Sequence, residues 1–414
     1  MKVLKFGGTS VGSAQRMKEV AKLITDGERK IVVLSAMSGT TNTLVEISDY
    51  LYKKNPEGAN EIINRLEAKY RQHIDELYAT PEYKEKGLEL IKSHFDYIRS
   101  YTKDLFTLFE EKVVLAQGEL ISTAMMNYYL QECGVKSVLL PALEYMRTDK
   151  NAEPDPVYIK DKLNVQLELH PDAEIYITQG FICRNAYGEV DNLQRGGSDY
   201  TASLIGAAVK ASEIQIWTDI DGMHNNDPRI VDKTSPVRHL HFEEAAELAY
   251  FGAKILHPTC IQPAKYANIP VRLLNTMDPT APGTLISNDT EKGKIKAVAA
   301  KENITAIKIK SSRMLLAHGF LRKVFEIFES YQTSIDMICT SEVGVSVSID
   351  NTKHLNEILD DLKKYGTVTV DKDMCIICVV GDLEWENVGF EAKALDAMRD
   401  IPVRMISFGG SNYN

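Results

Sequence analysis

The residues at the start of the chain are of the types that bind a phosphate group. The segment MKVLKFGGTSVGS ends an apolar run at Lys5 and Phe6 and follows it with a glycine turn and two hydroxyl side chains. Glycine leaves backbone N–H groups open to a ligand, and a lysine in an apolar strand is costly unless an anion partners it. The turn therefore predicts an anion site, although it matches neither common phosphate-loop fingerprint. The alternative is a lysine whose ammonium reaches solvent at the strand end.

Two further glycine turns carry similar chemistry. KIVVLSAMSGTTN adds Ser35, Ser38 and Thr41 after a second apolar run. RGGSDYTA places Arg195 before two glycines, and an arginine can hold a carboxylate through two parallel hydrogen bonds. Ser198 or Asp199 is expected to cap the small-residue helix that follows, whose N-terminus attracts anions. Taken alone, this third turn is also typical of a capped helix with no ligand.

Three other polar stretches are candidates. Glu119 lies in GELIST and, if buried, would pair with an ammonium group, the alternative being a helix cap. The loop WTDIDGMHNNDPRI holds several acids and Arg229, with a spacing that departs from a calcium loop, so proximity to nucleotide phosphates is preferred. His224 in that loop, and Lys254 in FGAKILHP, need no special function on their own.

Composition excludes several classes of protein. The chain has 414 residues, a formal net charge of −10 and no basic block, so nucleic acid and anionic membranes are not expected partners. Of six cysteines only Cys375 and Cys378 are close, and both are expected to be core thiols of a strand rather than a redox or zinc pair. We find neither a secretory signal nor an apolar run that could span a bilayer, so a cytoplasmic location is expected.

The elements that must position these residues form an α/β pattern. Apolar runs at 2–6 and 30–34 flank a helical repeat at 17–24, which predicts a parallel sheet covered by helices. Residues 43 to about 130 are expected to be almost wholly helical, and a helix beginning at Phe242 is expected to end at Pro258. Open α/β sheets bind ligands at the carboxyl ends of their strands, where the glycine turns would meet.

The remainder of the chain has a different pattern. The turn-rich stretch between Pro279 and Lys294 marks a boundary, which gives a catalytic domain at 1–288 and a second region at 289–414. That region predicts two small βαββαβ-like units, the second unfinished at Asn414. In the second unit, GFEAKALDAMRD is expected to be a helix and IPVRMISFGG a strand.

Together these stretches resemble the aspartate kinases of the amino-acid kinase superfamily, over essentially the whole chain. The motifs are KFGGTSV, LSAMSGTTN, GELIST, TQGFI, RGGSDYTA, WTDIDG with DPRIV, and FGAKILHP, in this order. The resemblance implies a mainly parallel sheet sandwiched by helices, followed by α+β ACT-type regulatory domains. It also implies that ATP, with Mg²⁺, phosphorylates the side-chain carboxylate of L-aspartate, and that the protein is a homodimer or a dimer of dimers through the ACT region.

The resemblance assigns roles by position. The catalytic group that it implies is Lys5, Gly7, Gly8, Asp199 and Lys254. The expected aspartate-binding residues are Ser38, Thr41, Glu119, Phe181, Arg195 and Ser198. The expected nucleotide-binding residues are Lys5, Gly8, Thr9, Ser10, Thr218, Asp219, His224, Arg229 and Lys254. Gln194 and His224 depart from the residues usual in the family, which predicts altered affinity rather than lost activity.

The tail resembles the effector segment of lysine-inhibited aspartate kinases, in MLLAHGFL and SIDMICTSEV. The implied amino-acid effector, lysine, would contact Met314, Gly319, Phe320, Leu321, Asp336, Ser341 and Glu342. Leu316 and Ala317 are apolar where lysine-type members tend to be polar, so threonine stays an alternative effector. Two other functions stay open: a superfamily enzyme with a different carboxylate or carbamate acceptor, and a catalytically silent amino-acid sensor.

Overall fold

The computed structural model describes residues 1–193, 196–251, 256–312 and 318–414. These form two compact units. The first contains Met1–His224, Pro236–Ala246 and the described residues of Lys254–Asp289. The second contains Asn225–Ser235, the described residues of Glu247–Ala253, and those of Thr290–Asn414. Each unit is described by itself below.

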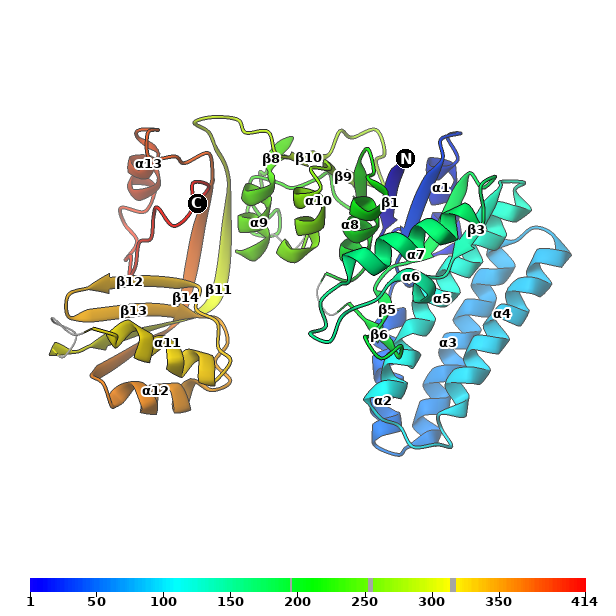
Figure 1. The fold of residues 1–414 in the computed structure, drawn as a ribbon, viewed down its shortest axis with the longest axis horizontal. Coiled ribbons are helices and arrows are strands. Elements are labelled where there is room, and N and C mark those ends of the chain that lie inside the picture. Colours follow the sequence, from blue (N-terminus) through cyan, green and yellow to red (C-terminus); the bar gives the residue numbers. More distant parts are fainter. Residues whose placement is uncertain (194–195, 252–255, 313–317) are drawn as a thin grey trace. The chain divides into compact units, whose positions relative to one another are not determined.

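The first unit is built on an eight-stranded sheet (Figure 1). In spatial order its strands are β3 (Ser137–Leu140), β4 (Ile175–Gln179), β2 (Lys30–Leu34), β1 (Lys2–Phe6), β7 (Ile214–Thr218), β9 (Val271–Asn275), β10 (Thr284–Ser287) and β8 (His239–His241). All neighbouring pairs are parallel except β9 with β10. The predicted, mainly parallel sheet is confirmed, and β1 lies at its centre.

Helices cover both faces of this sheet because its central strands are apolar on both sides. Leu4 and Phe6 of β1 belong to a buried cluster shared with α1 (Ala14–Ile24) and the helical segment described next. Side chains alternate along a strand, so Val3 and Lys5 face the other side, where α8 (Gly197–Val209) packs on β1.

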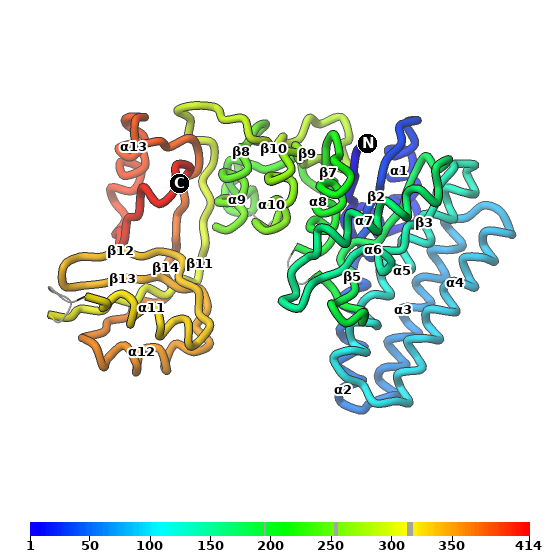
Figure 2. Tube along the Cα trace, in the orientation of Figure 1, coloured from blue at the N-terminus to red at the C-terminus, as the bar shows by residue number. Residues whose placement is uncertain are grey.

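Four helices fill the segment predicted to be helical: α2 (Thr40–Tyr52), α3 (Pro56–Leu77), α4 (Pro81–Ser100) and α5 (Leu108–Glu132). Proline occupies the first turn of α3 and of α4, where its missing N–H costs nothing. Thr107 and Glu110 form a capping box at the start of α5. The long helices α3 and α4 pack against each other and run side by side in Figures 1 and 2, which share one orientation.

Shorter elements complete the first unit. They are α6 (Ala142–Tyr145), α7 (Pro156–Glu168), the hairpin β5 (Ile182–Arg184) with β6 (Val190–Asn192), the 3₁₀ turn Pro258–Ile261 and α10 (Gln262–Tyr266). Helix α9 (Phe242–Tyr250) belongs to the first unit up to Ala246 and to the second unit from Glu247; it begins where expected but ends before Phe251. Lys254, predicted on its last turns, lies outside the described residues.

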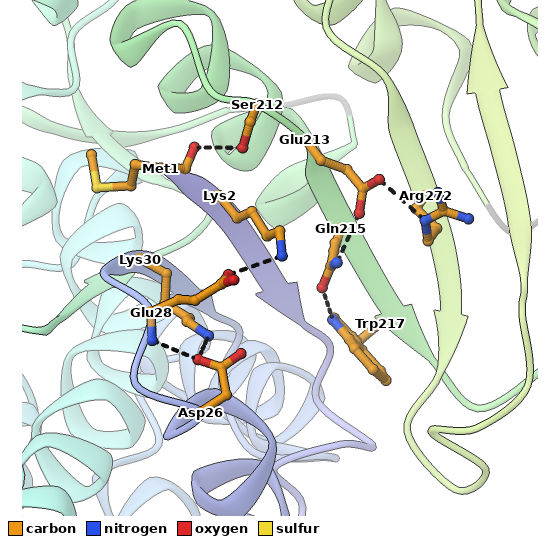
Figure 3. A network of polar contacts seen from close by, with 10 residues as sticks. All are labelled: Met1, Lys2, Asp26, Glu28, Lys30, Ser212, Glu213, Gln215, Trp217 and Arg272. Atoms are coloured by element: carbon orange, nitrogen blue, oxygen red, sulfur yellow. Dashed lines mark hydrogen bonds and ion pairs between the residues drawn. The ribbon is translucent and has the colours of Figure 1, made fainter.

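Polar contacts join the amino ends of the strands, away from the glycine turns (Figure 3). Lys2 Nζ of β1 lies 2.9 Å from Glu28 Oε2 in the loop before β2. Arg272 of β9 pairs with Glu213, which precedes β7, at 3.2 Å. The Trp217 indole of β7 donates to Gln215 at 3.1 Å. The two ion pairs hold neighbouring strands together at their amino ends, whereas the Trp217–Gln215 hydrogen bond lies within β7. The glycine turns follow the carboxyl ends of the strands.

The second unit has a four-stranded antiparallel sheet in the order β12 (Met337–Ser341), β13 (Gly344–Ile349), β11 (Ile295–Lys310) and β14 (Thr367–Gly381). Helices α11 (Phe320–Ser330) and α12 (Leu355–Lys363) contribute to one apolar core with it, and α13 (Phe390–Ala397) follows β14. The core includes Ile307, Val324, Phe328 and Ile358. The expected α+β character of this region is confirmed.

Two expectations for this unit are wrong. The strand predicted at IPVRMISFGG does not form; the segment is irregular, and Ile401 and Ile406 are 56% and 58% exposed. Its apolar alternation would need a neighbouring strand to pair with. Among the described backbone hydrogen bonds of this segment are those from Ile401 N to the Met398 carbonyl and from the Cys339 thiol to the Ile406 carbonyl, and neither belongs to a strand ladder. Cys375 is exposed whereas Cys378 is buried, because residues three apart in β14 face opposite sides.

No helix in the described part of the chain combines the length and the apolar character needed to cross a bilayer.

The first prediction concerns the central sheet. Ile177 of β4 is fully buried, so Ile177→Ala should lower the free energy of unfolding by about 2–5 kcal/mol through lost burial and the cavity left behind. Val165→Ala on α7 is the matched control, since Val165 is 50% exposed and should change stability by less than about 0.5 kcal/mol. Denaturant unfolding of both variants measures this, and equal effects would contradict the described core.

Candidate active site

The first two glycine turns meet at the carboxyl edge of the sheet, between β1 and β2. Ser35 N donates to the Phe6 carbonyl at 3.2 Å, and Ser38 N donates to the Gly8 carbonyl at 3.1 Å. A Cβ on Gly8 would lie only 2.8 Å from the Ala36 carbonyl oxygen. Any larger residue at position 8 would therefore push the two turns apart, which explains the glycine physically.

Lys5 is buried beneath the first turn and is paired. Its Nζ lies 2.8 Å from Asp199 Oδ1 on the first turn of α8. A Cβ on Gly7 would lie 3.4 Å from the same Nζ, so the ammonium sits beside the bare backbone of the turn. The alternative of an ammonium extended into solvent is excluded, because Lys5 is only 9% exposed. The pair fixes one positive charge at the edge where the turns converge.

The third glycine turn opens α8 with unusual backbone angles. Gly196 and Gly197 have φ values of +70° and +49°, and a Cβ on Gly196 would overlap the Cys260 sulfur at 1.7 Å. The expected cap is wrong: Gly196 is the N-cap and no side chain caps the helix. Ser198 instead receives a hydrogen bond from Ser35 at 2.9 Å, while Asp199 pairs with Lys5. Both side chains thus connect α8 to the glycine turns.

A cavity of about 270 Å³ lies between these turns and α5. Six predicted site residues line it, namely Gly8, Ser38, Thr41, Glu119, Phe181 and Ser198. The other lining residues are Ser35, Ala36, Met37, Gly39 and Gly197. Segments separated by more than a hundred residues thus line one small cavity, whose volume suits an amino acid.

Glu119 is the buried acid of this cavity. It lies in the middle of α5, is 4% exposed, and accepts one hydrogen bond, from Ala36 N at 3.3 Å. Its Oε2 is buried and has no hydrogen-bond partner among the described residues. Burial raises the pKa of this carboxyl from 4.5 to about 7. The position excludes a helix cap and leaves an acceptor for which an ammonium group would be a suitable partner.

The residues around Glu119 hold it close to the second turn. A Cβ on Gly118 would lie 2.7 Å from the Ala36 methyl, so α5 approaches the turn as closely as a glycine permits. One turn further along, Ser122 donates to the Ser35 carbonyl at 2.8 Å. Ser122 is the serine of the GELIST motif, but no role was predicted for it from the sequence; its position one turn after Glu119 on the same helix was the available signal.

Phe181 adopts a left-handed backbone conformation with a φ of +70°, which is uncommon for a residue other than glycine. Its N–H donates to Thr201 Oγ1 of α8 at 3.0 Å, and its carbonyl accepts from Leu193 N at 2.8 Å. These two hydrogen bonds hold the strained backbone in place beside the cavity.

The predicted nucleotide-binding residues do not all lie in one unit, and one of them lies outside the described residues. Thr218 ends β7, the neighbour of β1, and exposed Asp219 follows it in the next turn. Thr9 and Ser10 belong to the first glycine turn, so these residues share one edge of the sheet. His224 forms an isolated bridge with Pro236 in the first unit. Arg229 belongs to the second unit, in an exposed loop, with its guanidinium paired to Asp227. Arg195 and Lys254 lie outside the described residues.

The described residues contain no group of three or more His, Cys, Asp or Glu side chains arranged to hold a metal ion. Magnesium keeps several water ligands and is commonly held by substrate phosphates with one or two carboxylates. The site therefore fits Mg²⁺ only as an ion carried by the phosphates of a nucleotide, and not as an ion in a protein cage.

Comparison with known proteins decides the family, because the model of the Amino acid kinase family matches residues 1–275. The chain belongs to the amino acid kinase family. Within it, Aspartokinase 1, chloroplastic, of Arabidopsis thaliana is 36% identical over the whole chain and 76% of the relative. Lysine-sensitive aspartokinase 3 of Escherichia coli is 32% identical over the whole chain and 94% of the relative. These matches place the chain among the aspartokinases.

A solved structure agrees with this. The E. coli aspartokinase III complex with aspartate and ADP superposes with a TM-score of 0.84 at 31% identity, covering all of this chain and 94% of the other. The chain is therefore an aspartate kinase, with the fold of that family over both units.

The second prediction concerns the charge of Glu119. Its folded-state pKa is raised, so the folded protein retains a proton that the unfolded chain loses between pH 4.5 and about 7, and stability falls as the pH rises through that window. Glu119→Gln cannot ionise and should be more stable than the parent at pH 8, by on the order of 3 kcal/mol, with the gap closing near pH 4.5.

Thermal unfolding without ligands, across that pH range, measures this effect. Glu61→Gln, at an exposed position of α3, is the matched control and should show no pH-dependent gain. The Glu119 variant should also have a higher KM for the amino-acid substrate. A parent protein whose stability is flat between pH 4.5 and 7 would contradict the prediction.

Proposed function

We propose that this aspartate kinase transfers the terminal phosphoryl group of ATP to the side-chain carboxylate of L-aspartate, forming 4-phospho-L-aspartate. This product would open the biosynthesis of lysine, threonine and methionine. The observation that carries the proposal is the cavity between the glycine turns. Glu119 lies on its wall with an Oε2 that has no hydrogen-bond partner among the described residues, and the Lys5–Asp199 pair lies at the adjoining edge.

The chemistry needs little from a general base, because the acceptor carboxylate is already an anion at neutral pH. The barrier arises from two anions that approach each other. Lys5 and the bare N–H groups at Gly7 and Gly8 offset that repulsion from positions fixed before the substrates bind. Asp199 holds the Lys5 ammonium at the turn in the protein without ligand.

The other end of aspartate is an α-amino acid group, and the cavity suits it. The free carboxylate oxygen of Glu119 would accept the ammonium, and the hydroxyls of Ser38, Thr41 and Ser198 would orient the substrate. Arg195 would hold the α-carboxylate and Lys254 the phosphates; both roles rest on the resemblance of their motifs. A carbamate or simple carboxylate acceptor has no ammonium group to pair with Glu119 Oε2.

ATP is the proposed phosphoryl donor, with Mg²⁺ on its phosphates. Support comes from the related E. coli enzyme, which was solved with ADP. We place the nucleotide along the edge formed by the first glycine turn, Thr218 and Asp219, with His224 as a further contact. The proposed nucleotide role of Arg229 rests on the resemblance of its motif alone. All six cysteines are unpaired thiols, which agrees with the expected cytoplasmic location.

We propose that residues 1–288 form the catalytic domain and 289–414 a regulatory region of two ACT-like modules. Through this region the chain would form a homodimer or a dimer of dimers.

The third prediction tests the reaction. The parent protein should release ADP from Mg²⁺-ATP only when aspartate is present, and the acyl phosphate should be trapped as a hydroxamate. Lys5→Ala should lower kcat by about 10³-fold, because it removes a preorganised charge from the transition state. Lys2→Ala on the same strand is the matched control: Lys2 pairs with Glu28 at the far edge and should leave kcat unchanged.

Three outcomes would contradict the proposal. Undiminished turnover in Lys5→Ala would show that the Lys5 charge does not stabilise the transition state. Activity with glutamate or carbamate but not aspartate would indicate another superfamily enzyme. Amino-acid binding without any turnover would indicate a catalytically silent sensor.

Lysine is the proposed feedback inhibitor. Support comes from the lysine-sensitive E. coli relative, whose complex with lysine and aspartate superposes with a TM-score of 0.80. In the second unit, Asp336 precedes β12 with its side chain 1% exposed. Its Oδ1 receives the Tyr250 hydroxyl at 2.8 Å and Lys301 Nζ at 2.9 Å, while Oδ2 is buried with no hydrogen-bond partner among the described residues. An effector ammonium would suit that free oxygen.

The other predicted effector residues lie around α11 and β12. Gly319 opens α11 with a φ of +83°, Phe320 is buried and Leu321 is 37% exposed. Ser341 ends β12 and Glu342 follows it at the surface. Met314 lies outside the described residues.

The fourth prediction is that lysine inhibits the kinase and that Asp336→Asn raises the half-inhibiting lysine concentration roughly tenfold or more, through loss of a charge-assisted hydrogen bond. Asp350→Asn is the matched control: it removes the second partner of Lys301, at 2.8 Å, but leaves Asp336 intact. Titrating activity with each amino acid measures this. Inhibition by threonine alone would overturn the proposed effector.

A further inference from the structure

A buried hydroxyl chain joins three turns at the carboxyl edge of the sheet. Thr276 is the residue after β9 and is 7% exposed. Its Oγ1 lies 2.7 Å from Ser10 Oγ, in the first glycine turn, and 2.9 Å from the Thr218 carbonyl, at the end of β7. Its backbone N–H also donates to that carbonyl, at 2.8 Å. No motif in the sequence marks this residue.

The direction of these hydrogen bonds follows from counting protons. A hydroxyl carries one hydrogen, and a carbonyl can only accept, so Thr276 donates to Thr218. Ser10 must then donate its own hydrogen to Thr276. Ser10 is fully buried and has no second hydrogen to offer. Since the phosphate oxygens of ATP at neutral pH are acceptors, the Ser10 hydroxyl in this arrangement is not available to bind one.

The hydrogen bonds of Ser10 and Thr276 connect the turns after β1 and β7, which the backbone hydrogen bonds between these strands do not connect. The last paired residues of β1 and β7 are Phe6 and Trp217, so beyond them the two turns have no ladder between them. Ser10 N closes the glycine turn onto the Gly7 carbonyl at 3.0 Å. The Thr218 hydroxyl accepts from Ile220 N at 3.3 Å and shapes the turn that carries Asp219. Thr276 is the bridge that sets the separation of the two turns.

We infer that Thr276 is a positioning residue for the nucleotide: through Ser10 and Thr218 it fixes the phosphate-holding turn relative to the turn after β7, without touching the reacting atoms. The inference rests on the proposed placement of the nucleotide along this edge. Under this inference, the Ser10 hydroxyl connects the two turns by a hydrogen bond and does not bind a phosphate.

The fifth prediction tests this with a double-mutant cycle. Thr276→Val keeps the shape but removes the hydroxyl and should raise the KM for ATP roughly tenfold, with the KM for aspartate changed less than twofold. Thr276→Ser retains the hydroxyl and should restore the parent value. Ser10→Ala should resemble Thr276→Val, and the double variant should be no worse than the poorer single one.

Thr280→Val is the matched control, because Thr280 is exposed, four residues further on, and its hydroxyl donates to Asp278 within the same turn at 2.7 Å. It should leave both KM values unchanged. Thermal unfolding of every variant accompanies the kinetics. Parallel losses of stability and of affinity for both substrates, not rescued by Thr276→Ser, would overturn the inference in favour of a structural role alone.

A Ser10→Ala effect that is much larger than that of Thr276→Val and multiplies with it would also overturn the inference, since Ser10 would then act independently on the phosphate. The dissociation constant of a non-hydrolysable ATP analogue, measured by calorimetry, should show the same pattern. That measurement distinguishes the two proposals: absence of aspartate-dependent ADP release would refute the function, whereas unchanged analogue binding by Thr276→Val would refute the inference.

Discussion

The buried pair of Lys5 and Asp199 is the interaction on which the site depends. Desolvating a lysine inside a parallel sheet is costly, and the 2.8 Å contact across β1 and α8 compensates for it. The same contact sets where α8 begins, since its opening glycines let Ser198 and Asp199 face the turns instead of capping the helix. A positive charge thereby sits beside the bare amides of Gly7, where two anions would have to approach.

Glu119 differs from Lys5, because its carboxyl is buried without an ion-pair partner among the described residues. Burial raises the pKa of the Glu119 carboxyl to about 7 and lowers stability at neutral pH, and its Oε2 has no hydrogen-bond partner in the part of the chain that the structure describes. An amino-acid ammonium would supply the missing partner, so binding would recover free energy that folding gave up. A similar free oxygen on Asp336 in the second unit suggests the same device for an effector. In Glu119 and in Asp336, one carboxylate oxygen accepts a hydrogen bond, and the other has no partner among the described residues.

Family membership and local geometry contribute different things. The comparisons establish an aspartate kinase, whereas the cavity and its contacts give physical reasons for particular residues. Ser10 illustrates the difference: a motif assigns it to the nucleotide, but its only hydrogen is directed to Thr276. The hydroxyl chain shows how two ligand-holding turns are kept in register beyond the last rungs of the ladder.

The sequence by itself determined the strand–turn–helix order, the helical segment after residue 43, the two kinds of sheet and the glycine turns, because each depends on local periodicity or on backbone freedom. It could not determine that the Cys375 face of β14 is open, that residues 402–408 lack a strand partner, or that Ser198 and Asp199 face the turns, since each depends on distant neighbours. Thr276 had no signal at all, because its role exists only where three strand ends meet. The local sequence limits which residues can form a turn. Only tertiary packing decides which turns are joined by a hydrogen bond or an ion pair, or line the same cavity.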